Sequence, residues 1–250
     1  MNANIATPGM CLSAGARFAT KLGSISASHD LVDAFLKEGD SHSFYQVILE
    51  HFTPKASKTQ SLTPWVAAAL ANWGDFYQKF FGIDLDVTAI RIPEKVDGFD
   101  RLIVVAKGIR LNQVWNAHEE REIRTWKWWS GSLEKAMQES ERGPVKESYA
   151  FWVRDVQEAD EENKNLSAQM IADSPKKIDT ETLLERLVHG LKFWDEIEKQ
   201  LDVNNITLCA SSRCADGDVP RVCWDVGDVN VGRYGPSLRD PDLRARQAVR

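Results

Sequence analysis

Several signatures that assign an enzyme class directly are missing from this chain of 250 residues. There is no GxSxG nucleophile elbow, no GxxxxGK[ST] phosphate loop and no GxGxxG turn at the start of a helix. An excess of positive charge is missing too, since 31 basic residues stand against 37 acidic ones and leave a net charge of -6. The sequence therefore gives no indication of a serine hydrolase, of a nucleotide site or of nucleic-acid binding.

Long apolar runs are also missing. Residues 1–20 lack a basic start followed by an apolar core of signal-peptide length. No later run approaches the roughly 20 apolar residues that a membrane-spanning helix needs. We therefore expect no membrane insertion, and a cytoplasmic or virion-associated location.

Cysteine is scarce, and the four cysteines are too few for a disulfide scaffold. Three of them, Cys209, Cys214 and Cys223, lie in one short region. They form no CxxC pair and no histidine follows His189, so a zinc site would lack an obvious fourth ligand. One disulfide is a second possibility, and burial as small apolar side chains is the interpretation we favour. We expect no metal and no cofactor.

Helical apolar spacing dominates the first third of the chain, from residue 28 to residue 79. Thr63 and Pro64 supply a good N-cap and first residue for the last of these helices. Proline, glycine and acidic residues then interrupt the pattern over residues 93–100. We therefore predict a small helical N-terminal region over residues 1–95 and a second domain over residues 96–250.

The second domain mixes short strands with helices. Strands are expected at 101–107, 148–154 and 205–209, and helices at 132–142 and 180–201. The helix at 180–201 is the clearest, and Asp179 or Thr180 is its expected cap. The sequence after the last strand has the composition of loops. The predicted fold class is α+β, with a mixed or antiparallel sheet.

Some residues match a known kind of site only in part. His118 begins like the HExxH helix of zinc proteases, but Glu122 stands where the second histidine should be. Residues 155–162 hold five carboxylates without the glycine and ligand order of a calcium loop. We interpret both as solvated charged segments. Trp126 and Trp128 could stack on sugars or bases, but packing in the core on one face of a strand is the commoner role.

The segment from Asp202 to Arg246 follows a different composition rule from the rest. The chain contains 15 Lys, 17 Glu, 9 Gln and 4 Met, and none of them falls within these 45 residues. Every charged residue in the segment is Asp or Arg. A recognition surface favours such short or planar side chains over Lys and Glu. A plain succession of Gly- and Asp-rich turns is the alternative.

The same restriction has a genetic explanation. Mutation of the adenines in AAC or AAT codons can produce fifteen amino-acid types but never Lys, Glu, Gln, Met or Trp. Every residue of the segment except Trp224 belongs to the reachable set. The C-terminal sequence Arg239-Asp-Pro-Asp-Leu-Arg-Ala-Arg246 resembles a frequent ending of the variable proteins of diversity-generating retroelements, with Arg244-Ala245 in place of its Gly-Phe. The sequence Arg221-Val-Cys-Trp224 resembles a motif of formylglycine-generating-enzyme-type lectin folds, without its glycines. Over residues 180–250 the chain thus resembles the variable proteins of diversity-generating retroelements.

This resemblance implies a C-type-lectin-like domain with two helices and a mixed sheet, whose variable C-terminal loops occupy residues 202–246. Trp224, Val231 and Leu243 would be scaffold residues. The implied partner is a macromolecule, and the interface-like composition favours a protein. The candidate ligand-binding residues are Arg213, Asp216, Asp218, Asp225, Asp228, Asn230, Arg233, Tyr234, Ser237, Arg239, Asp240 and Asp242. Arg233 and Tyr234 are the strongest of them, because Arg and aromatic anchors dominate interface energy.

Two alternatives to a non-catalytic binding protein stay open. An oxidase of the formylglycine-generating type would need a metal and a convergent cysteine pair among Cys209, Cys214 and Cys223. A structural or assembly protein would use its C-terminal segment only to contact a neighbouring subunit. The oligomeric state does not follow from the sequence.

Overall fold

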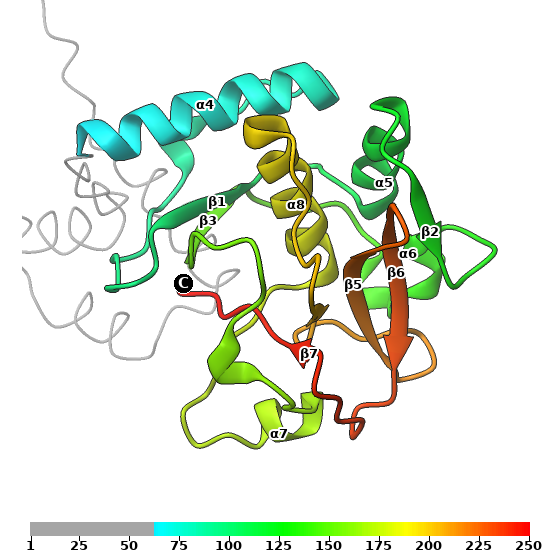
Figure 1. Ribbon diagram of the computed structural model, residues 1–250. Helices are drawn as coiled ribbons and strands as arrows, with labels where there is room; N and C mark the ends of the chain where they lie inside the picture. The colour runs from blue at the N-terminus through cyan, green and yellow to red at the C-terminus, as the bar shows by residue number, and fades with distance from the viewer. Residues whose placement is uncertain (1–62) are drawn as a thin grey trace, which may run out of the picture. The chain divides into compact units, whose positions relative to one another are not determined.

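The computed structural model describes residues 63–250, which are shown as coloured ribbon in Figure 1. They belong to one compact unit that runs from Leu62 to Arg250. The helices predicted before residue 63 lie outside the described residues, as does Cys11. Within residues 63–250, no helix is both long enough and apolar enough to cross a membrane.

The described chain alternates helices and strands (Figure 1). Its α-helices are α4 (Pro64–Phe81), α5 (Leu111–Glu120), α6 (Leu133–Ala136), α7 (Ala168–Ala172) and α8 (Leu183–Ile197). Its strands are β1 (Arg101–Val105), β2 (Thr125–Lys127), β3 (Tyr149–Val153), β4 (Ile206–Leu208), β5 (Val219–Asp225), β6 (Asp228–Tyr234) and β7 (Leu243–Arg244). Short 3-10 turns occupy Val87–Ala89, Glu139–Glu141 and Glu161–Asn163.

Helix α4 begins as predicted, because the Thr63 side chain accepts a hydrogen bond from the Val66 amide and Pro64 is the first helical residue. The helix is fastened to strand β1. The Trp73 indole donates to the Leu102 carbonyl at 3.0 Å, and the Tyr77 hydroxyl donates to the Val104 carbonyl at 2.8 Å. The division therefore differs from the predicted one at residues 95 and 96, since α4 shares one hydrophobic core with the strands that follow it.

The strands form two sheets. Strands β1 and β3 pair antiparallel, and the Trp152 amide and carbonyl of β3 both bond to Val249 near the C-terminus. The larger sheet has the order β2-β6-β5-β4-β7. Strand β5 is antiparallel to both of its neighbours, whereas β2 is parallel to β6 and β7 is parallel to β4. The predicted α+β class with a mixed sheet is confirmed.

Strands β1, β3 and β4 confirm the three predicted strands, but the sequence after residue 209 is not a succession of loops. Strands β5 and β6, which have seven residues each, form a hairpin there. The inner face of this hairpin carries Val222, Val229 and Val231, which pack in the main core with Leu187 and Leu191 of α8. The prediction was wrong because glycines and aspartates on the other positions mask the period-two pattern.

Helix α8 confirms the strongest predicted helix, although its cap lies two or three residues later than expected. Thr182 caps it and forms a reciprocal capping box with Glu185. The predicted helix at 132–142 is reduced to the four residues of α6 and a 3-10 turn. Helix α7 covers part of the outer face of the large sheet, where Ala168 and Ile171 pack with Leu208, Val219 and Leu243 in a second, smaller core.

Candidate functional site

The twelve predicted ligand-binding residues all lie at the surface or partly exposed, and none of them is buried. Exposed positions are Asp216, Asp225, Ser237, Arg239 and Asp242, and partly buried positions are Arg213, Asp218, Asp228, Asn230, Arg233, Tyr234 and Asp240. The predicted scaffold residues Val231 and Leu243 are fully buried, and Trp224 packs partly buried against the main core. The candidates do not form one site: ten of them fall into three groups, and Asn230 and Tyr234 lie on the outer face of the hairpin.

The first group lies where the hairpin begins and ends. The Arg233 guanidinium at the end of β6 donates to both Asp216 and Asp218 in the turn that precedes β5. Arg213 stabilises the backbone just before this turn, because its Nη1 donates to the Ala210 and Ser212 carbonyls, each at 2.7 Å. Arg233 is thus placed on the surface by two carboxylates, whereas Arg213 holds the backbone of the turn.

The second group is the hairpin tip, where Asp225 pairs with Asp228. Six residue-to-residue steps along the strand separate it from the Val219–Tyr234 pair at the other end of the hairpin, a distance of roughly 20 Å at the rise of a β-strand. The opposite ends of β5 and β6 can be followed in Figure 1. Arg124 pairs with the Asp228 carboxylate at 2.9 Å. No single small ligand can contact both the first and the second group.

The third group lies in the segment between β6 and β7. The Arg239 Nε donates to the Asn165 carbonyl at 3.1 Å, and the Asp240 carboxylate accepts from the Asp242 amide at 2.8 Å. These contacts are made to the backbone. They fix the shape of the segment and leave Ser237 and Asp242 exposed.

Two residues that the sequence analysis assigned to the core stand on the surface instead. Trp126 of β2 is 41% exposed and Trp128 is 60% exposed, and their rings meet edge to face at 6.4 Å. The prediction that they share one face of a strand and pack in the core was wrong on burial. Strand β2 is an edge strand, and its inner positions, Thr125 and Lys127, are the ones that contact α5.

The outer face of the sheet continues from Trp126 across the hairpin. Trp126 lies beside Asn230, and Asn230 lies opposite Cys223. Strand alternation places Arg221 and Tyr234 on this same face, away from the core residues Val222 and Val231. The Arg233 guanidinium lies 5.9 Å from the Trp128 ring. We call Trp126, Trp128, Arg221, Asn230 and Tyr234 the aromatic–arginine face, and we include Arg233, which strand alternation puts on the Val231 side of β6 but whose guanidinium reaches Trp128.

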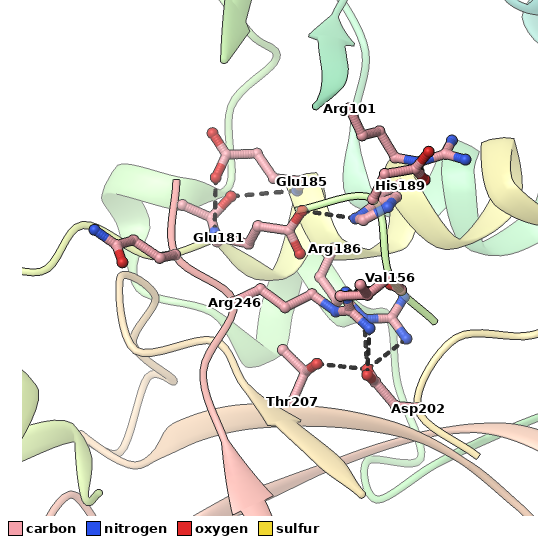
Figure 2. A network of polar contacts seen from close by, with 12 residues as sticks. Arg101, Val156, Glu181, Glu185, Arg186, His189, Asp202, Thr207 and Arg246 are labelled. Atoms are coloured by element: carbon pink, nitrogen blue, oxygen red, sulfur yellow. Dashed lines mark hydrogen bonds and ion pairs between the residues drawn. The ribbon is translucent and has the colours of Figure 1, made fainter. Parts of the chain in front are cut away.

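A second group of Asp and Arg residues from the same segment lies inside the molecule (Figure 2). The Asp202 carboxylate accepts from Arg186 Nη2 at 2.7 Å, from Arg246 Nη2 at 2.6 Å and from the Thr207 hydroxyl. Burial alone would raise the pKa of Asp202, but the two guanidinium groups hold it below its ordinary value. Asp202 and Arg246 are almost wholly buried. The two ends of the segment are therefore scaffold and not surface.

A buried histidine and glutamate adjoin this ion-pair network (Figure 2). His189 Nδ1 lies 2.9 Å from Glu181 Oε1, and both side chains are fully buried. Burial raises the pKa of Glu181 to about 7 and lowers the pKa of His189 well below its ordinary value. The network has no exposure to solvent through these two groups, so we regard it as structural.

The two charged segments that match known motifs only in part, around His118 and over residues 155–162, are also partly buried. His118 is buried, its Nδ1 lies 2.8 Å from the Val114 carbonyl, and burial lowers its pKa to about 4. Asp160 is buried, pairs with Arg154 and accepts from the Gln247 amide. The interpretation of both segments as wholly solvated was wrong. The first segment places a neutral histidine in the interior, and the second places an ion-paired aspartate there.

The three described cysteines are free and buried. Burial raises the pKa of Cys209 and of Cys223, and it raises the pKa of Cys214 to about 12. Thiolates are the form that binds metals and attacks electrophiles, so these thiols are poorly suited to either role. Within residues 63–250, no group of three or more His, Cys, Asp or Glu side chains is arranged to hold a metal ion.

Comparison with known protein families, with curated proteins and with solved structures finds no match to this chain.

Proposed function

We propose that this chain is a non-catalytic binding protein and that its aromatic–arginine face receives a protein ligand. One observation carries the proposal: the exposed Trp126 and Trp128 meet edge to face, and Trp128 lies beside Arg233, which belongs to the 45-residue segment that contains no Lys or Glu. Large exposed aromatic side chains are uncommon on a surface that contacts only water. Trp, Tyr and Arg are the residue types that most often dominate the energy of protein interfaces.

The arrangement of the segment supports a display role. Apolar residues occupy most inner positions of the hairpin, and Asp, Asn, Arg and Tyr occupy the turns and much of the outer face, where Val219 and Tyr234 pack with the smaller core. Replacement of outer residues would leave the main core unchanged. Such a division between scaffold and surface is what a diversified lectin-like domain of the retroelement type requires, and we propose that identity for residues 96–250.

The oxidase alternative is less well supported by the chemistry of the cysteines. That reaction needs a reactive thiolate, whereas burial raises the pKa of Cys209, Cys214 and Cys223. No cysteine among the described residues is exposed to a substrate. We therefore propose binding without catalysis.

The gene itself provides the first test. The candidate positions are expected to have codons that end in C or T, and a near-copy of the segment with AAC or AAT at those positions is expected beside a reverse-transcriptase gene. If those codons end in A or G as often as codons elsewhere in the gene, diversification by a retroelement is refuted. A binding surface fixed by ordinary selection would then be the remaining form of the proposal.

A folding experiment tests the display role without any known ligand. Asp216, Asp218, Asn230, Arg233 and Tyr234 are randomised together with pyrimidine-ending codons, and the surviving fraction of folded protein is measured by protease resistance. Most members should stay folded. A control library at the inner residues Val222, Val229 and Val231, built with the same codons, should lose the folded state in most members. Equal losses in the two libraries would contradict the proposal.

A further inference from the structure

Arg221 is an arginine on the aromatic–arginine face that has no acidic partner. Among residues 63–250, no carboxylate lies within ion-pairing distance of its guanidinium, and its one hydrogen bond is from Nη1 to the Cys223 sulfur at 3.0 Å. Its Nε is buried and has no acceptor. Most partly buried arginines elsewhere in the described chain are bonded to a carboxylate or to backbone carbonyls, as Arg233 and Arg213 are. A buried N–H without an acceptor is unfavourable.

The backbone holds the Arg221 guanidinium in place without an ion pair. Gly232 lies opposite Arg221 on β6, and a Cβ added to Gly232 would lie 2.7 Å from Nε and 2.9 Å from Nη2. The guanidinium therefore lies across β6 in the space that a side chain would fill. Its carbon atom is 5.6 Å from the centre of the Tyr234 ring. Stacking and close packing thus position a charged group whose Nη2 hydrogens have no acceptor among the described residues.

The charges around Arg221 do not neutralise it. The carboxylates of Asp216 and Asp218 are engaged by Arg233, Asp228 at the hairpin tip is engaged by Arg124, and Asp225 lies four residues from Arg221 along β5, roughly 13 Å at the rise of a β-strand. The neighbours of Arg221 on this face are aromatic or neutral: Tyr234, Cys223 and Asn230. The face therefore presents one uncompensated positive charge among aromatic rings.

We infer that Arg221 is the site at which the aromatic–arginine face binds a carboxylate of its protein ligand, from an Asp or Glu side chain or a C-terminus. The carboxylate accepts hydrogen bonds from Nη2 and neutralises the guanidinium, and the Tyr234 ring beside it limits the access of water to the pair. Guanidinium groups match carboxylates in both charge and planar geometry. The inference rests on the proposed function, because it names the ligand chemistry of the same surface.

The test follows the side-chain resonance of Arg221 Nε in the intact chain by NMR. Acetate is the probe, acetamide is its neutral control of similar size, and inorganic phosphate is the competing anion. Acetate should cause a saturable shift at Arg221 that acetamide does not cause. If Arg221 and the exposed Arg239 shift in parallel and without saturation, the effect is ionic strength and the inference is overturned. Saturation by phosphate but not by acetate overturns it as well.

Gly232→Ala provides the sharpest variant, because it displaces the guanidinium while it keeps the charge. The saturable acetate shift should be lost, and the melting temperature should show that the protein is still folded. Gly235→Ala is the matched control, since a Cβ at Gly235 meets nothing within 4 Å. It should bind acetate as the unaltered chain does. Arg221→Lys repeats the test if Gly232→Ala does not fold, and it should weaken the acetate shift at least several-fold, now measured at the Trp126 indole N–H.

The codon test and the library test do not involve Arg221. If they succeed and acetate does not bind, only the carboxylate site is refuted. If acetate binds and both of them fail, the carboxylate site stands on a surface that is not diversified.

Discussion

The residues between Asp202 and Arg246 use the same two charged side chains for opposite purposes. Asp202 lies inside the molecule with Arg186 and Arg246, and the side chains of all three are at most 4% exposed. Arg233 joins Asp216 and Asp218 on the surface, with side-chain exposures of 30%, 48% and 29%. Composition treats the two groups as equivalent, but their surroundings make the first a part of the buried scaffold and the second a part of the exposed surface.

The physical difference is the solvent. A carboxylate that has left water depends on its partners for all of its stabilisation, so removal of one partner leaves an uncompensated buried charge. A carboxylate on the surface is solvated whether or not an arginine is near. Variants at Asp202 and at Arg233 test whether burial explains the different contributions of the two groups to stability.

Asp202→Ala should have the largest effect. It would leave the Arg186 and Arg246 guanidinium groups buried together without their shared carboxylate. We expect a loss of about 3–5 kcal/mol in the free energy of unfolding, measured by urea denaturation. Asp242→Ala, an exposed aspartate of the same segment, is the control and should change stability by less than about 0.5 kcal/mol. Similar losses in the two variants would remove the distinction between the groups.

The Glu181–His189 pair should make opposite contributions to the pH dependence of stability, which cancel over part of the acid range. Glu181 keeps its proton up to about pH 7 when folded, against an ordinary pKa of 4.5, so its contribution to stability falls as the pH rises through that window. His189 is neutral when folded and charged when unfolded below its ordinary pKa of 6.5, so its contribution falls as the pH drops below 6.5. Between pH 4.5 and 6.5 the folded and unfolded pairs each hold about one proton, and the two effects cancel.

Glu181→Gln should reveal the uncompensated histidine. The stability of this variant should rise between pH 5 and 6.5, relative to the unaltered chain, by up to about 1.4 kcal/mol per pH unit. Urea unfolding at several pH values measures the slope. Glu139→Gln, on the surface, should keep the slope of the unaltered chain. A Glu181→Gln slope that also matches it would mean that His189 is not held neutral by burial.

The contrast between the two groups also explains what the sequence could predict. Helices α4 and α8 and strands β1, β3 and β4 were predictable, because their apolar periodicity or a strong cap is local in the chain. The burial of Asp202 was not, because it depends on Arg246, 44 residues away. For Trp126 the strand alternation gave the correct shared face, but not which face α5 would cover. The exposed candidate residues follow from composition, whereas Arg221 emerges only from the pairing of β5 with β6.

The hairpin tip contains a residue type that is unfavourable for the backbone conformation of its turn. Val226 and Gly227 form its two-residue turn, with φ values of 50° and 84°. Asn-Gly is the preferred pair for such a turn, and a β-branched residue at positive φ is strained. Val226 is also 83% exposed, so little internal packing offsets the strain.

Val226→Asn should therefore stabilise the protein by about 1 kcal/mol and raise the melting temperature by about 2–4 °C, as measured by calorimetry. Val203→Asn is the matched control, because Val203 is 46% exposed and its φ is not positive. It should change the melting temperature by less than about 1 °C. No gain at Val226 would mean that the turn is not strained.

The surface cluster itself should give the smallest effect. In a double-mutant cycle, Arg233→Ala and Asp218→Ala should show a coupling of about 0.5 kcal/mol or less in the free energy of unfolding, because both groups are solvated and Asp216 competes for the same guanidinium. The coupling should shrink further in 0.5 M salt, since screening acts on exposed pairs. The corresponding cycle between Arg246→Ala and Asp202→Ala should give a coupling several times larger that changes little with salt. A large, salt-insensitive coupling at Arg233 would place that cluster in the scaffold and would leave Trp126, Trp128 and Arg221 as the binding face.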